Sequence, residues 1–304
     1  MPLSRVADNV VHLSSAVRQV WTHPANRGLR SRAILRYFAW QAWKRVVGGP
    51  VDVSYHGLRL RCYADSHSAS AALYFSGLPE YREMSFVVQY LRPGDRFLDV
   101  GANIGIYTLL ATTRVGAAGY VHAFEPAYVP LQRLRENVAL NNLNNVSVHA
   151  AAVAESNGNR EFGFSGDDST GRIRGAADRS IGGAEVTTVR LDDYFENENF
   201  TMAKFDIEGA EPLALRGAAK MLSKGNPPVI QVEMDGYCKR YGITTPEFIS
   251  ELSDFGYSVG IYCPSRCAVS YTNEPWKHTA VNVLAVADSY RSKLAARLCA
   301  GDMI

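Results

Sequence analysis

The 304-residue sequence lacks several features that would define its class at once. It contains no uninterrupted apolar stretch approaching the roughly 18 residues that a membrane span needs. Its N-terminus has no basic region followed by an apolar core, so we expect no signal peptide and a cytoplasmic protein. A net charge of only +2 gives no reason to expect nucleic acid as a partner.

Cysteine is scarce as well. Five cysteines, an odd number, are scattered along the chain, which argues against a disulfide framework and for a reducing compartment. Cys263 and Cys267 lie four residues apart, but no second pair of ligands completes a zinc set. We therefore predict no metal site. A divalent cation held by the oxygens of Asp206 and Glu233 is an alternative that spacing does not decide.

Basic residues are concentrated at the N-terminus. The first 50 residues contain eight lysines and arginines and one acid, Asp8, whereas the remainder has 24 basic against 29 acidic residues. We expect this extension, residues 1–50, to be helical in two pieces that break near residues 23–26. The second piece, Ser31 to Val47, mixes basic with aromatic side chains. Packing on the flank of the main domain is the simpler interpretation, and contact with an anionic membrane surface is the alternative.

The rest of the chain predicts an α/β fold. Alternating residues at 51–55 and 58–63 around His56-Gly57 predict a β-hairpin, which begins a lead-in extending to residue 80. From 81 to 290, helices alternate with strands at about 96–100, 119–124, 146–150, 202–205, 228–232, 257–262 and 280–286. This rhythm is typical of a parallel sheet with helices on both faces. Residues 155–190 interrupt it as an insertion, and 291–304 form a C-terminal tail.

The stretch FLDVGANIGIYT, residues 97–108, predicts a nucleotide-binding corner. An apolar strand leads into a turn of small residues and then into the start of a helix. Asn103 occupies the place of the middle glycine of a dinucleotide fingerprint, and Asp99 precedes the turn. A carboxylate there would repel a pyrophosphate, but it suits a ligand with a cationic amine and no phosphate. S-adenosylmethionine is such a ligand.

Acidic residues stand at four of the first five strand ends: Asp99, Glu125, Asp206 with Glu208, and Glu233. In an open parallel sheet, ligands lie beyond these carboxyl ends. Glu125 follows Gly105 by twenty residues, where an acid can accept both hydroxyls of a ribose. Asp206 or Glu208 could bind an amine, position a substrate hydroxyl or deprotonate it, or could simply cap the next helix. Glu233 could serve as base, substrate ligand or metal ligand.

One further residue depends on these acids. Lys204 lies inside the strand that precedes Asp206, and a buried lysine needs an acidic partner.

Several segments together resemble the FkbM family of class I S-adenosylmethionine-dependent methyltransferases. They are PGDRFLDVGANIGIYTLLA (93–111), AFEP (123–126), AKFDIEGAEPLALRGAAKML (203–222) and PPVIQVE (227–233). The resemblance implies a Rossmann-like, seven-stranded mixed sheet whose last strand is antiparallel. It also implies methyl transfer to a hydroxyl of a sugar, a glycan or another small natural product.

The resemblance implies roles for individual residues too. Those that would contact S-adenosylmethionine are Asp99, Gly101, Asn103, Gly105 and Glu125, with Glu80 or, alternatively, Glu83 added from the segment LPEYRE. Those that would face the transferring methyl group and the substrate are Asp206, Glu208 and Glu233.

Two other functions remain open at this point. The first is a nicotinamide-dependent oxidoreductase on a similar sheet, which Asp99 and the missing middle glycine disfavour. The second is a non-catalytic protein at a membrane periphery or in a scaffold, which the intact acids at the strand ends disfavour. The sequence makes no prediction of the oligomeric state.

Overall fold

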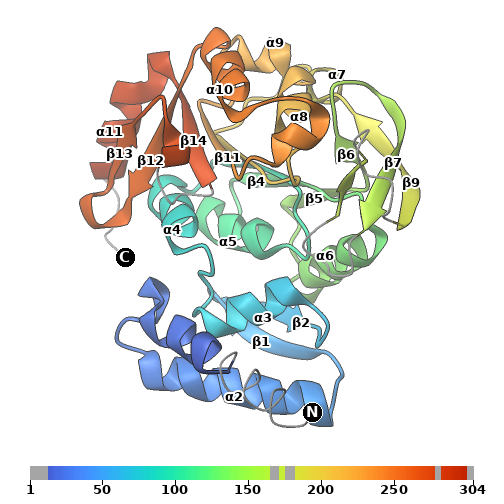
Figure 1. Cartoon of the computed structure of the whole chain (residues 1–304), viewed down its shortest axis with the longest axis vertical. Coiled ribbons are helices and arrows are strands. Elements are labelled where there is room, and N and C mark those ends of the chain that lie inside the picture. The colour runs from blue at the N-terminus through green and yellow to red at the C-terminus, as the bar shows by residue number, and fades with distance from the viewer. Residues whose placement is uncertain (1–12, 165–170, 175–181, 278–281, 300–304) are drawn as a thin grey trace, which may run out of the picture.

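The computed structural model describes residues 13–164, 171–174, 182–277 and 282–299. Its central feature is a large mixed sheet (Figure 1). Within the described residues this sheet contains β3 (Arg96–Val100), β4 (Tyr120–Phe124), β5 (Val146–His149), β10 (Met202–Phe205), β11 (Val229–Glu233), β12 (Tyr257–Cys263), β13 (Ala268–Tyr271) and β14 (Asn282–Ala287). Their order across the sheet is β13-β12-β14-β11-β10-β3-β4-β5. The predicted α/β class is confirmed.

Strand direction also agrees with the expectation, but the strand count does not. The strands β11, β10, β3, β4 and β5 are mutually parallel, and β14, the last in the chain, is antiparallel to both of its neighbours. The expected seven strands are wrong, because β13 adds an eighth at the edge. This strand has only four residues and none of them is buried, so it lacks the apolar signal of an inner strand.

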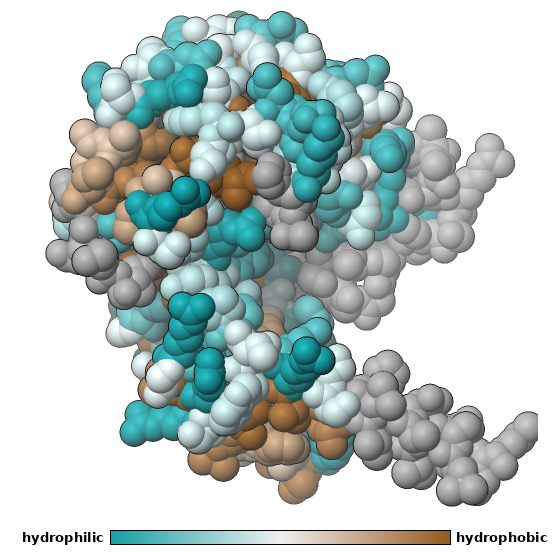
Figure 2. All heavy atoms as spheres, turned by 60° about the vertical axis from the view of Figure 1, so that its left-hand side comes forward, coloured by the Kyte–Doolittle hydropathy of each residue, from teal (hydrophilic) through white to brown (hydrophobic). Residues whose placement is uncertain are grey.

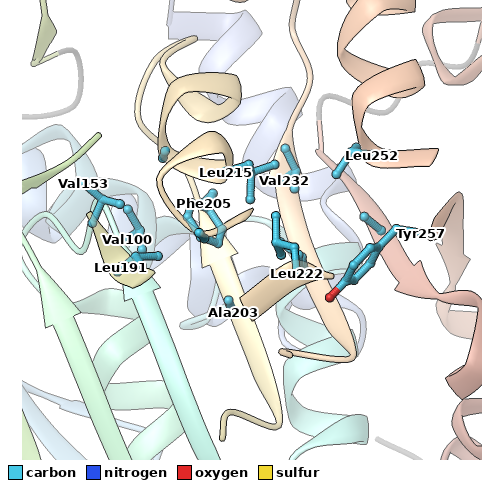
Figure 3. Close-up of a cluster of buried hydrophobic side chains, with 14 of the residues drawn as sticks. Val100, Val153, Leu191, Ala203, Phe205, Leu215, Leu222, Val232, Leu252 and Tyr257 are labelled. Carbon is cyan, nitrogen blue, oxygen red and sulfur yellow. The ribbon is translucent and has the colours of Figure 1, made fainter. Parts of the chain in front are cut away.

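Helices cover both faces of the sheet and form two hydrophobic cores. On one face lie α7 (Leu191–Tyr194), α8 (Glu211–Arg216), α9 (Ala219–Leu222) and α10 (Thr245–Asp254), whose side chains pack with Val100 and Phe205 (Figure 3). On the other face lie α4 (Tyr81–Tyr90), α5 (Ile106–Val115) and α11 (Arg291–Cys299), which pack against Phe97 and Val121. Because side chains alternate along β3, Asp99 shares the α5 face with Phe97.

The insertion forms a second, smaller sheet beside the first. It contains β6 (Ala152–Val153), β9 (Gly182–Val189), β7 (Gly158–Phe164) and β8 (Arg172–Ile173), in that order. Phe162 and Ile173 pack with Ala127 at the start of α6 (Tyr128–Leu140), and a small core joins the insertion to the main sheet. The insertion is therefore a folded wall in its described part.

An N-terminal layer lies against the end of the main domain (Figure 1). It comprises helical residues 13–22, η1 (Pro24–Asn26), α2 (Arg30–Val46), the hairpin strands β1 (Val51–Tyr55) and β2 (Leu58–Cys62), and α3 (His67–Tyr74). Short 3-10 turns elsewhere are η2 (Tyr237–Tyr241), η3 (Pro264–Arg266), η4 (Pro275–Lys277) and η5 (Asp288–Tyr290). Among the described residues, none of the helices combines the length and apolar character that crossing a bilayer requires.

Helix α3 was not expected from the sequence. Its serines and alanines form no clear apolar stripe, and its stability comes from specific contacts. Ser66 caps it by accepting a hydrogen bond from the Ala69 N–H at 3.0 Å. Ser70 Oγ accepts a hydrogen bond from Trp40 Nε1 at 2.9 Å.

Candidate active site

A cavity of about 900 Å³ opens at the carboxyl ends of the parallel strands. Its walls come from the lead-in, the main sheet and the insertion. The lining includes eight of the nine residues predicted for the site: Glu80, Asp99, Gly101, Asn103, Glu125, Asp206, Glu208 and Glu233. The ninth, Gly105, is not part of the lining. The fold thus gathers acids that are up to 153 residues apart in the sequence around one space.

The turn after β3 has its shape because of Gly101. This residue has φ +83°, and a Cβ atom there would lie 1.9 Å from the carbonyl oxygen of Asp206. The Gly101 and Ala102 N–H groups donate to the Phe124 carbonyl at 3.0 and 2.9 Å. The turn is therefore pressed between the ends of β4 and β10, which requires a residue without a side chain.

Gly105 acts one step further along, at the start of α5. It has φ +95°, and an added Cβ would meet Leu134 Cδ1 of α6 at 2.6 Å. Because Gly105 has no side chain, α6 can pack closely against the turn. Gly105 therefore supports the site through this packing and does not line the cavity.

Asp99 is fully buried beneath the turn. Its Oδ2 accepts a hydrogen bond from Thr108 Oγ1 at 2.6 Å, whereas its Oδ1 is buried and has no hydrogen-bond partner among the described residues. Burial raises the pKa of Asp99, and the nearby Lys204 and the Thr108 hydroxyl oppose that rise. A buried carboxylate oxygen left unpaired at a cavity wall is costly unless a ligand satisfies it. A cationic amine would do so.

Glu125 is held by the backbone instead. Its Oε2 accepts the Asn103 N–H at 2.9 Å, and its Oε1 accepts the Ala127 N–H at 2.8 Å. These bonds tie the end of β4 to the glycine turn and orient the carboxylate. Each carboxylate oxygen can accept more than one hydrogen bond, so the group can still receive the hydroxyls of a ribose.

Lys204 is a buried cation among three of the acids of the site, namely Asp206, Glu80 and Asp99. Its Nζ donates to Asp206 Oδ2 at 2.6 Å and lies 4.4 Å from the centre of the Tyr107 ring. It also stands opposite Asp99 in the pairing of β10 with β3. Burial alone lowers the pKa of Lys204, but the surrounding carboxylates, led by Asp206, raise it above its usual value. The predicted acidic partner is confirmed as Asp206.

Glu80 reaches the cavity from the lead-in. Its Oε2 accepts hydrogen bonds from the Tyr107 hydroxyl at 2.7 Å and from Asn282 Nδ2 at 3.2 Å. Burial raises the pKa of Glu80, and Lys204 partly offsets the rise. Asn282 was not expected here from the sequence, and neither was Gln231, whose Nε2 donates to the Tyr107 oxygen at 3.0 Å. The available signal was a polar residue in a mainly apolar strand: Asn282 opens β14, and Gln231 lies between Ile230 and Val232 in β11.

Glu208 and Glu233 lie where several acids crowd together. Glu208 adopts φ +60°, and burial together with Asp206 and Asp235 raises its pKa to about 7, against the opposing charge of Arg240. Arg240 Nη1 lies 4.0 Å from Glu208 Oε2. Burial and the nearby carboxylates raise the pKa of Glu233 far above its usual value, and its Oε2 is buried with no partner in the part of the chain that the structure describes. Glu233 is therefore protonated at neutral pH and can donate a hydrogen bond.

Glu211, also part of the acidic segment, is not in the cavity lining. Its Oε1 accepts the N–H groups of Ile207 at 2.8 Å and Gly209 at 3.3 Å. Burial raises the pKa of Glu211 to about 8, while these two N–H groups oppose the rise. It holds the loop that presents Asp206 and Glu208.

The remaining lining is largely apolar and comes from other elements. Tyr128 and Val129 of α6 and Phe162 and Ile173 of the insertion form one wall. Among the residues that the structure describes, no three His, Cys, Asp or Glu side chains are grouped as metal ligands.

Comparison with known proteins relates this chain to methyltransferases. The family model for the methyltransferase FkbM domain matches residues 99–259. A curated relative, the 31-O-demethyl-FK506 methyltransferase FkbM of Streptomyces tacrolimicus, is 43% identical over 74 residues. That match spans 24% of this chain and 28% of the relative, so the chain covers less than a third of the curated relative's length.

Two solved structures resemble the chain in part. An S-adenosylmethionine-dependent O-methyltransferase of Thermotoga maritima is 13% identical with a TM-score of 0.38, covering 68% of this chain and 64% of the other. Aeropyrum pernix fibrillarin, solved with natively bound S-adenosylmethionine, is 15% identical with a TM-score of 0.37, covering 79% and 84%.

Proposed function

The chain belongs to the methyltransferase FkbM domain family, whose model matches more than half of its 304 residues, and we propose that it is an S-adenosylmethionine-dependent O-methyltransferase. S-adenosylmethionine is the cofactor of this family. The acceptor we propose is a hydroxyl group of a sugar, a glycan or a small natural product. The observation that carries the proposal is the cavity in which the predicted acids meet.

The residues present fit this cofactor. The unpaired Oδ1 of Asp99 suits the amino group of the methionine part. Glu125, oriented by two backbone N–H groups, suits the ribose hydroxyls. Tyr128 and the wall beside it supply an apolar surface for a base. Each hydrogen bond to a charged group contributes roughly 1.5–3 kcal/mol, which is enough to orient a nucleoside.

The bound cofactor would supply a methyl group that is already electrophilic, so the protein has to align the acceptor oxygen and remove its proton. Glu208 is the best-suited base, because a pKa of about 7 leaves it ionised in part at neutral pH and still able to accept a proton. Protonated Glu233 would position the acceptor by donating a hydrogen bond. Alignment can contribute as much as about 7–11 kcal/mol in well-oriented systems.

The oxidoreductase alternative fits these residues less well. A buried carboxylate under the glycine turn disfavours a pyrophosphate, and Asp99 is that carboxylate. The scaffold alternative does not account for the buried oxygens of Asp99 and Glu233 that have no partner among the described residues and cost stability in the absence of a ligand.

Calorimetric titration with S-adenosylmethionine, S-adenosylhomocysteine and NADH tests the proposal. We expect saturable binding of both sulfur nucleosides, weakened about 10- to 100-fold by Glu125→Ala, because hydrogen bonds to the ribose are lost. Asp254→Ala, which removes an exposed acid at the end of α10, is the matched control and should leave Kd unchanged. Binding of NADH alone would make the oxidoreductase the better hypothesis, and binding of none of the three would favour the scaffold.

A further inference from the structure

Helix α2 has two apolar faces, and within the described residues only one of them packs against the rest of the chain. Ala33, Tyr37 and Trp40 form the inner face and are buried against α3 and its neighbours. On the same side, Arg36 Nη2 donates to Ser76 Oγ at 2.6 Å. Together with the bond from Trp40 Nε1 to the α3 serine, this contact fixes the rotation of the helix and hence which face points outward.

The outward side of α2 carries a second apolar stripe. Leu35, Phe38 and Val46 are 70%, 45% and 83% exposed, and Ala39 and Ala42 between them are exposed too. Spacings of three and four residues place these side chains along one side of the helix, opposite the inner face. Figure 2 shows an apolar patch at the N-terminal end of the molecule.

Basic residues border this stripe. At 3.6 residues per turn, Arg32 lies on one flank of the stripe and Arg45 on the other, and both are exposed. Residues 9–51 contain no acid at all. Within the described part of the chain, neither arginine forms an ion pair: the Arg45 guanidinium donates only to the Gln41 carbonyl, at 3.2 Å. We call this surface the outer α2 face.

We propose that the outer α2 face docks on the surface of an anionic lipid bilayer. An exposed apolar stripe with arginines on both flanks is the arrangement in which a helix lies in the plane of a membrane interface. The stripe would enter the boundary between headgroups and acyl chains, while the long arginine side chains extend to the lipid phosphates. This proposal is independent of the methyl-transfer chemistry.

A second copy of this chain is the less suitable occupant. Most homodimers are two-fold symmetric, so the same patch would face itself. The outer α2 face would then bring basic residues against basic residues, with no acid in residues 9–51 to compensate. An anionic surface has the complementary charge and needs no particular partner shape.

Docking in this way would also bring the cavity close to the bilayer. Helix α3 packs against the inner face of α2, and its residues His67 and Ala71, with Phe75 just after the helix, also belong to the cavity lining. The membrane and the site would be separated by little more than these two helices.

Co-sedimentation of the full chain with vesicles tests this proposal. We expect binding to vesicles of phosphatidylcholine mixed with phosphatidylglycerol, and much weaker binding to phosphatidylcholine alone or at high salt. Arg32→Gln/Arg45→Gln should weaken binding about 25-fold, at about fivefold for each arginine near the surface. Leu35→Ser/Phe38→Ser should weaken it at least about tenfold, because the apolar contact is lost.

The matched control is Lys220→Gln/Lys224→Gln, which removes two exposed charges at the distant helix α9 and the residues just after it. It should leave vesicle binding within about twofold of the wild type. Unchanged S-adenosylmethionine binding in every variant would show that the fold is intact. If both α2 variants bind vesicles as tightly as the wild type does, the proposal is overturned. It is also overturned if the wild-type protein is a dimer that Leu35→Ser/Phe38→Ser dissociates, because the outer α2 face would then contact a second copy.

Discussion

The two ends of the cavity hold their carboxylates in opposite ways. Beside the glycine turn, Glu125 is fixed by two backbone N–H groups and Asp99 by the Thr108 hydroxyl. Beyond β10 and β11, Glu208 and Glu233 are surrounded mainly by other acids, which helps to raise the pKa of both. The first arrangement suits the binding of a ligand with hydroxyl and amino groups. The second suits a proton transfer near neutral pH.

The sharpest test of this contrast is Glu208→Gln. If Glu208 is the base, kcat should fall about 10²- to 10⁴-fold while Kd for S-adenosylmethionine is unchanged. Wild-type kcat should also decline as the pH drops below about 7, because only the ionised carboxylate accepts a proton, and the variant should lose this dependence. Single-turnover assays with an accepted substrate, measured across pH, would check both effects.

The result that contradicts this assignment is equally specific. If Glu208→Gln keeps the kcat and the pH profile of the wild type, Glu208 is not the base, and either Asp206 takes that role or the reaction needs no base. If Glu208→Gln instead loses cofactor binding, the acids beyond β10 and β11 also serve to bind the cofactor, and the contrast between a binding end and a proton-transfer end is wrong.

Lys204 connects the two ends, so its loss should damage both. Lys204→Met leaves Asp206 without its ion pair and removes the cation that also faces Asp99. Because breaking a buried ion pair leaves an uncompensated charge, we expect the free energy of unfolding to fall by about 3–5 kcal/mol.

Urea denaturation would measure this change. Lys220→Met, at an exposed position on α9, is the control and should shift the free energy of unfolding by no more than about 0.5 kcal/mol. Equal stability of the two variants would mean that Lys204 does not balance the acids.

The smallest expected effect concerns the close approach of the glycine turn, at one end of the cavity, to the backbone carbonyl of Asp206, near the other end. In Gly101→Ala the new alanine would have to adopt a positive φ, and its Cβ would also meet the Asp206 carbonyl. In Gly94→Ala the alanine would have to adopt φ +91°, but its Cβ would lie in open space. The two variants share the cost of the left-handed conformation, about 1–2 kcal/mol. Gly101→Ala should therefore be less stable by a further roughly 1–3 kcal/mol, which is the typical cost of overpacking.

The same denaturation series would measure that difference. If both variants lose the same stability, the close approach of the turn to β10 does not constrain the site.

Much of the molecule could be predicted from local pattern. The parallel strands, the hairpin and α2 follow from apolar runs and turn residues, which depend on neighbours in the sequence, whereas the antiparallel last strand was implied only by the family resemblance. Strand β13 was missed because it has only four residues and none of them is buried, and α3 was missed because Trp40, which helps to hold it, lies 30 residues from Ser70 in the sequence. Their own residues carry little periodic signal.

The sequence by itself determined which acids stand at the strand ends and that a glycine turn lies among them, because in a parallel sheet the carboxyl ends of strands meet at one edge. Only the tertiary structure decided what each acid can do. Burial and neighbouring charges act through space, so they separate Glu208, with a pKa of about 7, from the hydrogen-bonded Glu125 and the structural Glu211. For the same reason only the folded chain reveals that α2 leaves one of its two apolar faces exposed.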